Sequence, residues 1–231
     1  MRTFAIVPAR SGSQGLTGKN IRVVAGRSLL ERAIDFARML PVDEVIVSTD
    51  SEEYARIARS AGATTPGLRG EGASGSTAME PAVIDDLSQR FREHGIDAPD
   101  AVVWIRPTFV FRSLSATIAC IDLVANAGRS SARVVTEVDP RLYRGGEDGR
   151  LEPTFPDGGA SMVRRQGLTP LYHVFNIEVF RWPSGTCPVD YLGHDVGFAV
   201  APKLCGVDID TAEDAAIAEA LLSVLDTGVL P

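Results

Sequence analysis

The sequence predicts a three-layer α/β fold, in which a mostly parallel sheet lies between two layers of helices. Short apolar runs of strand length alternate with longer segments whose apolar residues recur at the helical period of about 3.6 residues. Glycine, proline and helix-capping residues separate these segments. Such alternation favours parallel strands joined by right-handed crossovers. The composition, 45% hydrophobic and 23% charged, fits one globular domain over residues 1–231.

The first strand and helix frame the most informative part of the chain. Residues 3–7 (TFAIV) form an apolar run that ends at a proline, and we interpret them as a buried strand. A glycine-rich loop follows over residues 9–26. The next helix begins in a capping box formed by Ser28 and Glu31 and ends before Pro41. The loop therefore follows a strand end, where open α/β sheets bind ligands.

The remaining elements continue the alternation of strands and helices. Residues 101–105 (AVVWI) form the most apolar run, which predicts a central strand. In chain order, we also expect a strand at 44–48, a helix from Ser51 to Ala61, a helix from the Thr77–Glu80 capping box to Glu93, a helix at 113–127, strands at 132–138 and 199–207, and a helix at 212–225 behind a Thr-x-x-Asp cap.

One segment, residues 140–185, breaks this alternation. Glycine, proline and arginine are frequent in it, and it has few apolar positions with which to build a core of its own. We therefore interpret residues 140–185 as an inserted arm, either a hairpin or an element of dimerisation.

Composition and charge exclude several classes of function. The formal net charge is −7, which argues against a large basic face for duplex nucleic acid. No window approaches the roughly 18 apolar residues of a membrane span, and the N-terminal apolar run is too short for a signal peptide. The three cysteines, Cys120, Cys187 and Cys205, are odd in number and lack metal-site spacing. We therefore expect a cytoplasmic protein that binds neither nucleic acid nor membranes.

The loop at residues 8–20 (PARSGSQGLTGKN) has the composition of an anion site. Glycines allow backbone N–H groups to approach phosphate oxygens, and Ser11 and Ser13 add hydroxyl donors. Arg10 and Lys19 supply positive charge. The segment matches neither the Walker nor the GxGxxG pattern, and the simpler alternative is a glycine-rich turn with solvated charges.

Six short motifs, all in the same order, resemble those of the acylneuraminate cytidylyltransferases (CMP-sialic acid synthetases). The first is IVPARSGSQGLTGKNI at residues 6–21, beside the family's I-P-A-R-x-G-S-K-G-x-x-x-K-N-I. The other five are Val45–Asp50, Leu68–Arg69 ahead of Ser76–Thr77, Arg106–Thr108 with Arg112, Arg164–Gln166, and Asp208–Thr211. The resemblance covers nearly the whole chain and implies a Rossmann-like nucleotidyltransferase fold.

The resemblance implies that the first motif binds CTP. Arg10 and the backbone of residues 11–15 would hold the triphosphate, and Lys19 would lie against the α-phosphate. The implied nucleotide-binding residues are Ala9, Arg10, Ser11, Gly12, Ser13, Lys19, Asn20, Arg69 and Thr77. Arg10, Lys19 and Asp210 are the implied catalytic residues.

The resemblance also implies that Asp208 and Asp210 bind Mg²⁺. Alternate residues of an extended segment point the same way, and two nearby carboxylates suit a hard divalent cation that bridges phosphates. The alternative for this turn is a helix N-cap, and both can hold if Asp210 or Thr211 caps the last helix while Asp208 faces the metal.

The sequence departs from the family mainly where the acceptor would bind. Arg106 replaces the family's usual Gln, and residues 172–179 (YHVFNIEV) differ from its R-x-N-G-A-I-Y segment, while at the triphosphate loop Gln14 replaces the usual Lys. The acceptor-binding residues predicted here are Arg106, Thr108, Arg165, Gln166 and Tyr172. We expect Arg106 to bind the acceptor's acidic group, and the alternative is that it pairs with a core carboxylate such as Glu137.

Together these observations predict an enzyme that transfers CMP from CTP to a small anionic acceptor, releases pyrophosphate and requires Mg²⁺. The acceptor expected by default is a nonulosonic acid of the sialic type. One alternative is a phosphonate acceptor, and another is a nucleotide-binding protein without turnover. Relatives lend the motif at residues 164–166 to a neighbouring subunit's pocket, so a homodimer is expected.

Overall fold

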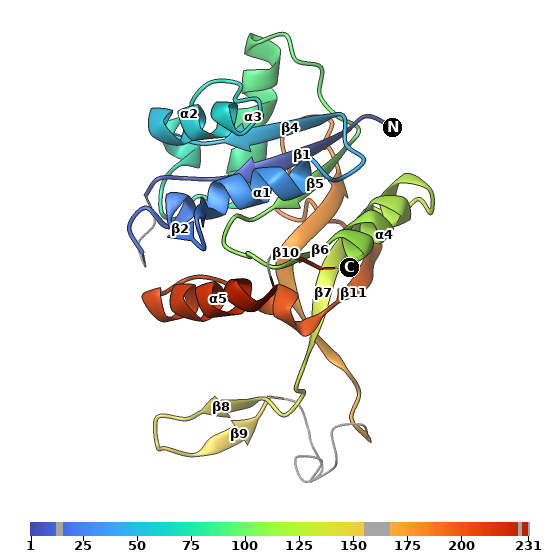
Figure 1. Cartoon of the computed structure of the whole chain (residues 1–231). Coiled ribbons are helices and arrows are strands. Elements are labelled where there is room, and N and C mark those ends of the chain that lie inside the picture. Colours follow the sequence, from blue (N-terminus) through green and yellow to red (C-terminus); the bar gives the residue numbers. More distant parts are fainter. Residues whose placement is uncertain (13–15, 155–166, 226–227, 231) are drawn as a thin grey trace.

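The computed structural model describes residues 1–12, 16–154, 167–225 and 228–230. A six-stranded sheet runs through the molecule in the order β11-β7-β10-β5-β1-β4 (Figure 1). Its strands are β1 (Thr3–Pro8), β4 (Glu44–Ser48), β5 (Ala101–Ile105), β7 (Ser131–Val138), β10 (Leu171–Arg181) and β11 (Val196–Ala201). Strand β10 runs antiparallel to β5 and β7, and the other neighbours are parallel. The expected mostly parallel sheet is confirmed, with one reversed strand.

Five α-helices and several short elements complete the described chain. The helices are α1 (Leu29–Ala37), α2 (Glu52–Ser60), α3 (Glu80–Glu93), α4 (Leu114–Ala125) and α5 (Ala212–Leu225). Short 3₁₀ helices lie at Lys19–Ile21, Glu71–Ala73 and Lys203–Gly206, and two-stranded pairs are formed by β2 (Val23–Val24) with β3 (Arg27–Ser28), β6 (Arg112–Ser113) with β12 (Val229–Leu230), and β8 (Tyr143–Gly145) with β9 (Leu151–Pro153). None of the helices in the described residues is long and apolar enough to cross a membrane.

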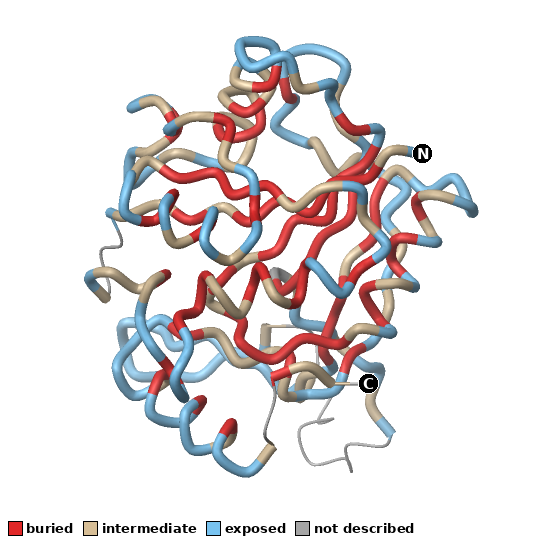
Figure 2. The backbone as a smooth tube through the Cα atoms, turned by 45° about the horizontal axis from the view of Figure 1, so that its top comes forward, coloured by how far each residue is buried: buried red, intermediate tan, exposed pale blue. Residues whose placement is uncertain are grey.

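Two hydrophobic layers enclose the sheet, which confirms the three-layer architecture. Because side chains alternate along a strand, Ala5 and Val7 of β1 join the cluster that contains α1 and α4. Phe4 and Ile6, on the other face of the same strand, pack with α3. Figure 2 shows the buried residues concentrated along the strands. All five residues of β5 are buried, as a central strand requires.

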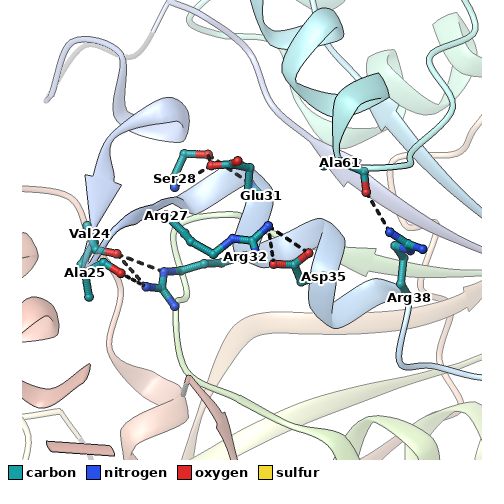
Figure 3. Close-up of polar contacts among 9 residues, drawn as sticks. All are labelled: Val24, Ala25, Arg27, Ser28, Glu31, Arg32, Asp35, Arg38 and Ala61. Carbon is teal, nitrogen blue, oxygen red and sulfur yellow. Dashed lines mark hydrogen bonds and ion pairs between the residues drawn. The ribbon is translucent and has the colours of Figure 1, made fainter. Parts of the chain in front are cut away.

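Helix α1 begins as the sequence predicts. The Ser28 hydroxyl accepts the Glu31 N–H, and the Glu31 carboxylate accepts the Ser28 N–H, which completes the capping box (Figure 3). These bonds to Ser28 also lower the pKa of Glu31. Arg32 donates to the carbonyls of Val24 and Ala25 at 2.7 and 2.8 Å, which ties the helix to the β2–β3 turn. The capping box thus fixes the start of the helix, and Arg32 fixes the end of the preceding loop.

The capping box predicted at Thr77–Glu80 is wrong. Helix α3 begins after Met79, which makes no side-chain cap, and Thr77 is exposed. The Glu80 carboxylate contacts Arg106 at 2.8 Å instead of the helix N-terminus. A long-range ion pair has therefore replaced the local bond that the spacing suggested.

The expected arm at residues 140–185 needs a correction. Residues 171–181 are the strand β10, the longest in the sheet, and they pair with β5 and β7. Among the described residues of this segment, the hairpin of β8 and β9 extends from the body at the far end of β7 (Figure 1), and the residues of both strands are exposed. The sequence prediction missed β10 because its Tyr, His, Glu and Arg residues interrupt the apolar pattern.

The last predicted strand is also shifted. Strand β11 ends at Ala201, and a 3₁₀ helix at Lys203–Gly206 replaces the remainder of the expected strand at 199–207. Helix α5 spans the predicted residues 212–225. Its Thr-x-x-Asp cap is confirmed, because Asp214 N–H donates to the Thr211 hydroxyl and the Asp214 carboxylate accepts the Thr211 N–H.

Candidate active site

A cavity of about 550 Å³ opens at the carboxyl ends of β1 and β5, and we call it the cleft. From β1 the chain crosses to β4 on one side, and it later enters β5 on the other side, so the strand order reverses here. Ligands of open α/β sheets bind at such a switch point. The cleft is lined by Pro8, Arg10, Lys19, Asn20, Arg69, Ala78, Glu80, Val83, Trp104, Arg106, Pro107, Thr108, Asp210 and Thr211.

Positive charge predominates among the residues that line the cleft. Four side chains are cationic, those of Arg10, Lys19, Arg69 and Arg106, whereas only Glu80 and Asp210 carry carboxylates. The chain as a whole has a net charge of −7, so the cationic group is a local feature of this site. A concave site with this charge attracts small anions such as phosphates.

The loop after β1 is held by its neighbours. Ser11 donates its backbone N–H and its hydroxyl to the Asp50 carboxylate, at 2.7 and 3.1 Å. The Asn20 amide donates to the Arg10 carbonyl at 2.9 Å, and the buried Ala9 donates its N–H to the carbonyl at the end of β4. Arg10 itself donates to the carbonyl of Gly75 at 3.1 Å. Both ends of the loop are thus anchored while the Arg10 side chain lines the cleft.

Arg69 forms the buried wall of the cleft. It is only 8% exposed, and its guanidinium donates to the hydroxyl and the carbonyl of Ser48, at 3.0 and 2.6 Å. Burial lowers the pKa of Arg69 to about 10, so the side chain stays charged at neutral pH. Two bonds to the end of β4 fix this charge before any ligand arrives.

Lys19 and the segment 208–211 are in direct contact at the cleft. The Lys19 ammonium lies 2.7 Å from the Asp210 carboxylate. Between the two acidic residues, Ile209 is fully buried and donates its N–H to the Thr108 carbonyl. Because side chains alternate along an extended segment, Asp208 and Asp210 lie on the side opposite Ile209. The predicted pair of carboxylates therefore shares one side of the segment, next to Lys19.

Asp208 has the properties of a cation ligand. One of its carboxylate oxygens, Oδ1, is buried without a hydrogen-bond partner. Burial raises the pKa of Asp208, and the nearby Asp210 carboxylate adds to the rise, while a hydrogen bond from Thr108 opposes it. A divalent cation would satisfy the orphaned oxygen and offset the repulsion. No cluster of three or more metal-ligating side chains occurs in the described part of the chain, so phosphate or water oxygens would complete the coordination.

Arg106 pairs with two carboxylates, one of them fully buried. Its Nη2 lies 2.8 Å from Glu80 Oε1, and its Nη1 lies 3.1 Å from Glu178 Oε2. Burial disfavours the charged guanidinium, but Glu178 and Glu80 outweigh burial and raise the pKa of Arg106. The sequence suggested Glu137 as the core carboxylate, whereas the buried carboxylate beside Arg106 is Glu178. Arg106 nevertheless lines the cleft, so pairing and ligand contact are compatible.

The sequence of the chain is similar to those of known proteins. Residues 4–95 match the sequence family described as Cytidylyltransferase, and this range includes β1, its loop and Arg69. The N-terminal part of the chain is therefore similar to cytidylyltransferases. Over 135 residues it is 33% identical to the CMP-N,N'-diacetyllegionaminic acid synthase of Legionella pneumophila, a match that covers 58% of each chain.

A second relative and a solved structure extend the comparison. The 3-deoxy-manno-octulosonate cytidylyltransferase of Xanthobacter autotrophicus is 25% identical over 195 residues, which cover 79% of this chain and 72% of the relative. The structure of CMP:2-keto-3-deoxy-manno-octonic acid synthetase complexed with CTP superposes with a TM-score of 0.66 at 13% identity, covering 97% of this chain and 100% of that one. This structural likeness confirms the nucleotidyltransferase fold expected from the sequence.

The cleft brings together seven of the sixteen residues singled out from the sequence. Those predicted residues that line it are Arg10, Lys19, Asn20, Arg69, Arg106, Thr108 and Asp210. Ala9 is buried behind the loop, and Ser11 is bonded to Asp50. Gly12 and Thr77 are exposed on segments next to the cleft residues Arg10 and Ala78.

Other predicted residues do not lie in the cleft. Tyr172 is 40% exposed on β10, and its ring contacts that of Phe198 in a tilted arrangement with the ring centroids 5.2 Å apart, so the structure gives no support to its predicted contact with an acceptor. Ser13, Arg165 and Gln166 lie outside the described residues. Conversely, sequence reasoning missed Glu80 and Glu178 as neighbours of Arg106. In the sequence, the only sign of them was a negative charge at the start of a predicted helix, for Glu80, and a negative charge among apolar residues, for Glu178.

Proposed function

We propose that this chain is a CTP-dependent cytidylyltransferase that transfers CMP to a small acidic acceptor and releases pyrophosphate. One observation carries the proposal most directly. Arg10, Lys19, Arg69 and Asp210 all line the cleft at the switch point of the sheet, Lys19 is in contact with Asp210, and Asp208 lies two residues before Asp210. Transfer of a phosphoryl-type group needs cationic side chains that bind the phosphates and carboxylates that bind a divalent ion.

The proposed reaction is a direct displacement at phosphorus. The hydroxyl oxygen of the acceptor attacks the α-phosphorus in line, the bond from that phosphorus to the β-phosphate bridging oxygen breaks, and the hydroxyl proton passes to solvent. Arg10 and Lys19 stabilise the negative charge that develops on the leaving pyrophosphate. The loop of residues 9–12, anchored to Asp50 and Ser48, holds the triphosphate.

Asp208 and Asp210 are the residues that would hold Mg²⁺. Bound there, the cation would neutralise phosphate charge and lower the pKa of the attacking hydroxyl. The orphaned Oδ1 of Asp208 supports this assignment. The salt bridge of Lys19 to Asp210 keeps the second carboxylate oriented toward the same side of the cleft.

We propose a nonulosonic acid as the acceptor. The Legionella relative carries a diacetyllegionaminic acid synthase name, and the chain spans 58% of that relative's length. Arg106 is a guanidinium at the cleft that can pair with an acceptor carboxylate. The alternative phosphonate acceptor depends on the same residue. A dianion is less well matched, because Glu80 and Glu178 already balance the charge around Arg106.

We also propose that the protein acts as a homodimer. The β8–β9 hairpin projects from the body and carries Leu151, 71% exposed, next to the exposed Leu142 and Tyr143. A projecting arm with exposed apolar side chains suits contact with a second subunit.

Pyrophosphate release tests the proposed activity. The purified protein would be incubated with CTP, Mg²⁺ and pyrophosphatase, together with a panel of sugar acids and phosphonates. We expect phosphate release with CTP and a sugar acid, and no release with ATP, GTP or UTP. Release only with phosphonates would replace the proposed acceptor. Binding of CTP without release for any acceptor would instead support a nucleotide-binding protein without turnover.

A further inference from the structure

Arg106 is held between two carboxylates that differ in how freely they can move. Glu178 is fully buried in the middle of β10, where it pairs in register with Trp104 of β5 and Arg133 of β7. Glu80 is the first residue of α3, and its side chain is 33% exposed to the cleft and solvent. One partner is thus fixed by the sheet, and the other can turn away.

Glu178 sits within a set of polar groups. Besides Arg106, it contacts Arg133 Nη2 at 3.2 Å and lies 3.5 Å from the Tyr191 hydroxyl. Burial and the charge of Glu178 raise the pKa of Tyr191, so its hydroxyl is available as a donor rather than as an anion. Removal of a charge from such a set leaves another buried charge unpaired, so Glu178 cannot leave Arg106 without a large cost.

The charge balance of the set limits what can replace Glu80. Arg106 and Arg133 carry two positive charges, and Glu178 and Glu80 carry two negative charges. A monoanionic carboxylate that takes the place of Glu80 on Arg106 Nη2 preserves this balance. A dianion in the same position adds an uncompensated charge at a site where Arg106 is only 16% exposed.

We propose that Glu80 occupies the acceptor's carboxylate position on Arg106 in the free protein and is displaced by that carboxylate on binding, while Glu178 is a positioning residue that holds the guanidinium in place. This inference rests on the proposed function and adds to it a selection for monocarboxylate over dianionic acceptors. Glu80 therefore competes with the substrate for Arg106, and Glu178 fixes the orientation in which the guanidinium faces the substrate.

The test uses two isosteric variants with opposite expected effects. Glu80→Gln removes the competitor, so the dissociation constant of N,N'-diacetyllegionaminic acid should fall by about 5-fold, the worth of a partly exposed ion pair. Glu178→Gln loosens the guanidinium, so the same constant should rise by about 10-fold, as for a lost charged hydrogen bond. Glu93→Gln, at the opposite end of α3, is the matched control and should change neither.

Binding would be read from Trp104, which lines the cleft, in a Trp182→Phe background with CTP present. Thermal protection by CTP, measured on the same samples, reports whether each variant is folded and binds nucleotide. Should Glu178→Gln fail this check, the comparison of Glu80→Gln with the parent protein decides alone. Methylphosphonate, measured at pH 9 so that it is a dianion, serves as the dianionic probe and should bind at least 10-fold more weakly than the sugar acid at the same pH.

Several outcomes would overturn the inference. An unchanged or weaker affinity in Glu80→Gln would show that Glu80 is not a competitor, and tighter binding of methylphosphonate would remove the charge argument. The inference would also be overturned if the sugar acid changed the fluorescence of neither the parent protein nor Glu80→Gln. If CTP still protected both proteins against thermal unfolding, cytidylyl transfer would remain open. If CTP did not protect the parent protein against thermal unfolding, the proposed function itself would be refuted.

Discussion

Asp208 is the residue at which burial and charge conflict most clearly. Its Oδ1 has no hydrogen-bond partner, and burial raises its pKa, so the ionised form is disfavoured when no cation is present. Such a group costs stability in the free protein and becomes favourable only when a cation pairs with it. The conflict has the form expected of a ligand site, where local strain is offset by the bound group.

Substitution of this carboxylate should separate turnover from stability. Asp208→Asn should raise the Mg²⁺ concentration for half-maximal turnover by well over 10-fold, because loss of outer-shell partners alone costs about 10- to 100-fold. Without divalent cations its melting temperature should stay the same or rise, since the disfavoured charge is gone. Steady-state kinetics across a Mg²⁺ series and thermal unfolding measure the two effects. Parental Mg²⁺ dependence in the variant would contradict the metal assignment.

Residue types and spacing were sufficient to predict part of the site. Arg10, Lys19 and Asp210 belong to short motifs, and they converge on the cleft because their segments follow strand ends or cap a helix. The partners of Arg106 could not be predicted in this way. Glu178 reaches it through an antiparallel register between β10 and β5, and a register between distant strands leaves no mark in local sequence.

At the scale of single elements, the two candidate capping boxes behave differently. Ser28 and Glu31 exchange both bonds, whereas Glu80 is drawn to Arg106 and α3 starts without a side-chain cap. The same short pattern therefore gave one correct and one wrong prediction. The difference lies in tertiary competition for the carboxylate, which the pattern does not contain.

Ser28 and Thr77, the first residues of the two candidate capping boxes, provide a matched pair of variants. Ser28→Ala should lower the free energy of unfolding by about 1 kcal/mol, the usual worth of an N-cap. Thr77→Ala, at an exposed position without a capping role, should stay within about 0.5 kcal/mol of the parent. Urea unfolding followed by circular dichroism measures both. An equal loss in the two variants would contradict the assigned caps.

Strand prediction was accurate where burial is two-sided and apolar, and failed where polar residues interrupt it. The runs at 44–48 and 101–105 were predicted with their observed bounds. Strand β10 was assigned to an arm, although Ile177, Val179 and Phe180 are fully buried in it. Its polar residues interrupt the apolar pattern, and one of them, Glu178, is held in the buried strand by its ion pair with Arg106.

At the scale of the whole molecule, the three cysteines are free and buried. Burial raises the pKa of Cys120 to about 12 and that of Cys205 to about 11. Because the reactive form is the thiolate, both thiols stay protonated and inert up to about pH 9. Ellman's reagent at pH 8 should therefore titrate few thiols in the native protein and three after unfolding in guanidinium. Rapid native reaction of all three would contradict this burial.

The proposed dimer makes a second prediction at this scale. Leu151→Glu places a charge on the exposed tip strand of the β8–β9 hairpin and should shift a homodimer toward the monomer, because a desolvated charge opposes association. Light scattering at micromolar concentration measures the mass. Ser223→Glu, on the exposed surface of α5, is a control expected to leave the mass unchanged. A fully active monomer before substitution would remove the dimer from the account.

The fate of the α-phosphate tests the central claim most directly. CTP labelled with ³²P at the α-position, or separately at the γ-position, would be incubated with the protein, Mg²⁺ and N,N'-diacetyllegionaminic acid. We predict α-label in a new sugar nucleotide and γ-label only in pyrophosphate, with neither product formed by Asp210→Asn. If the α-label remained in CTP with every sugar acid and phosphonate tested, or if the γ-label entered the acceptor, cytidylyl transfer at this cleft would be contradicted.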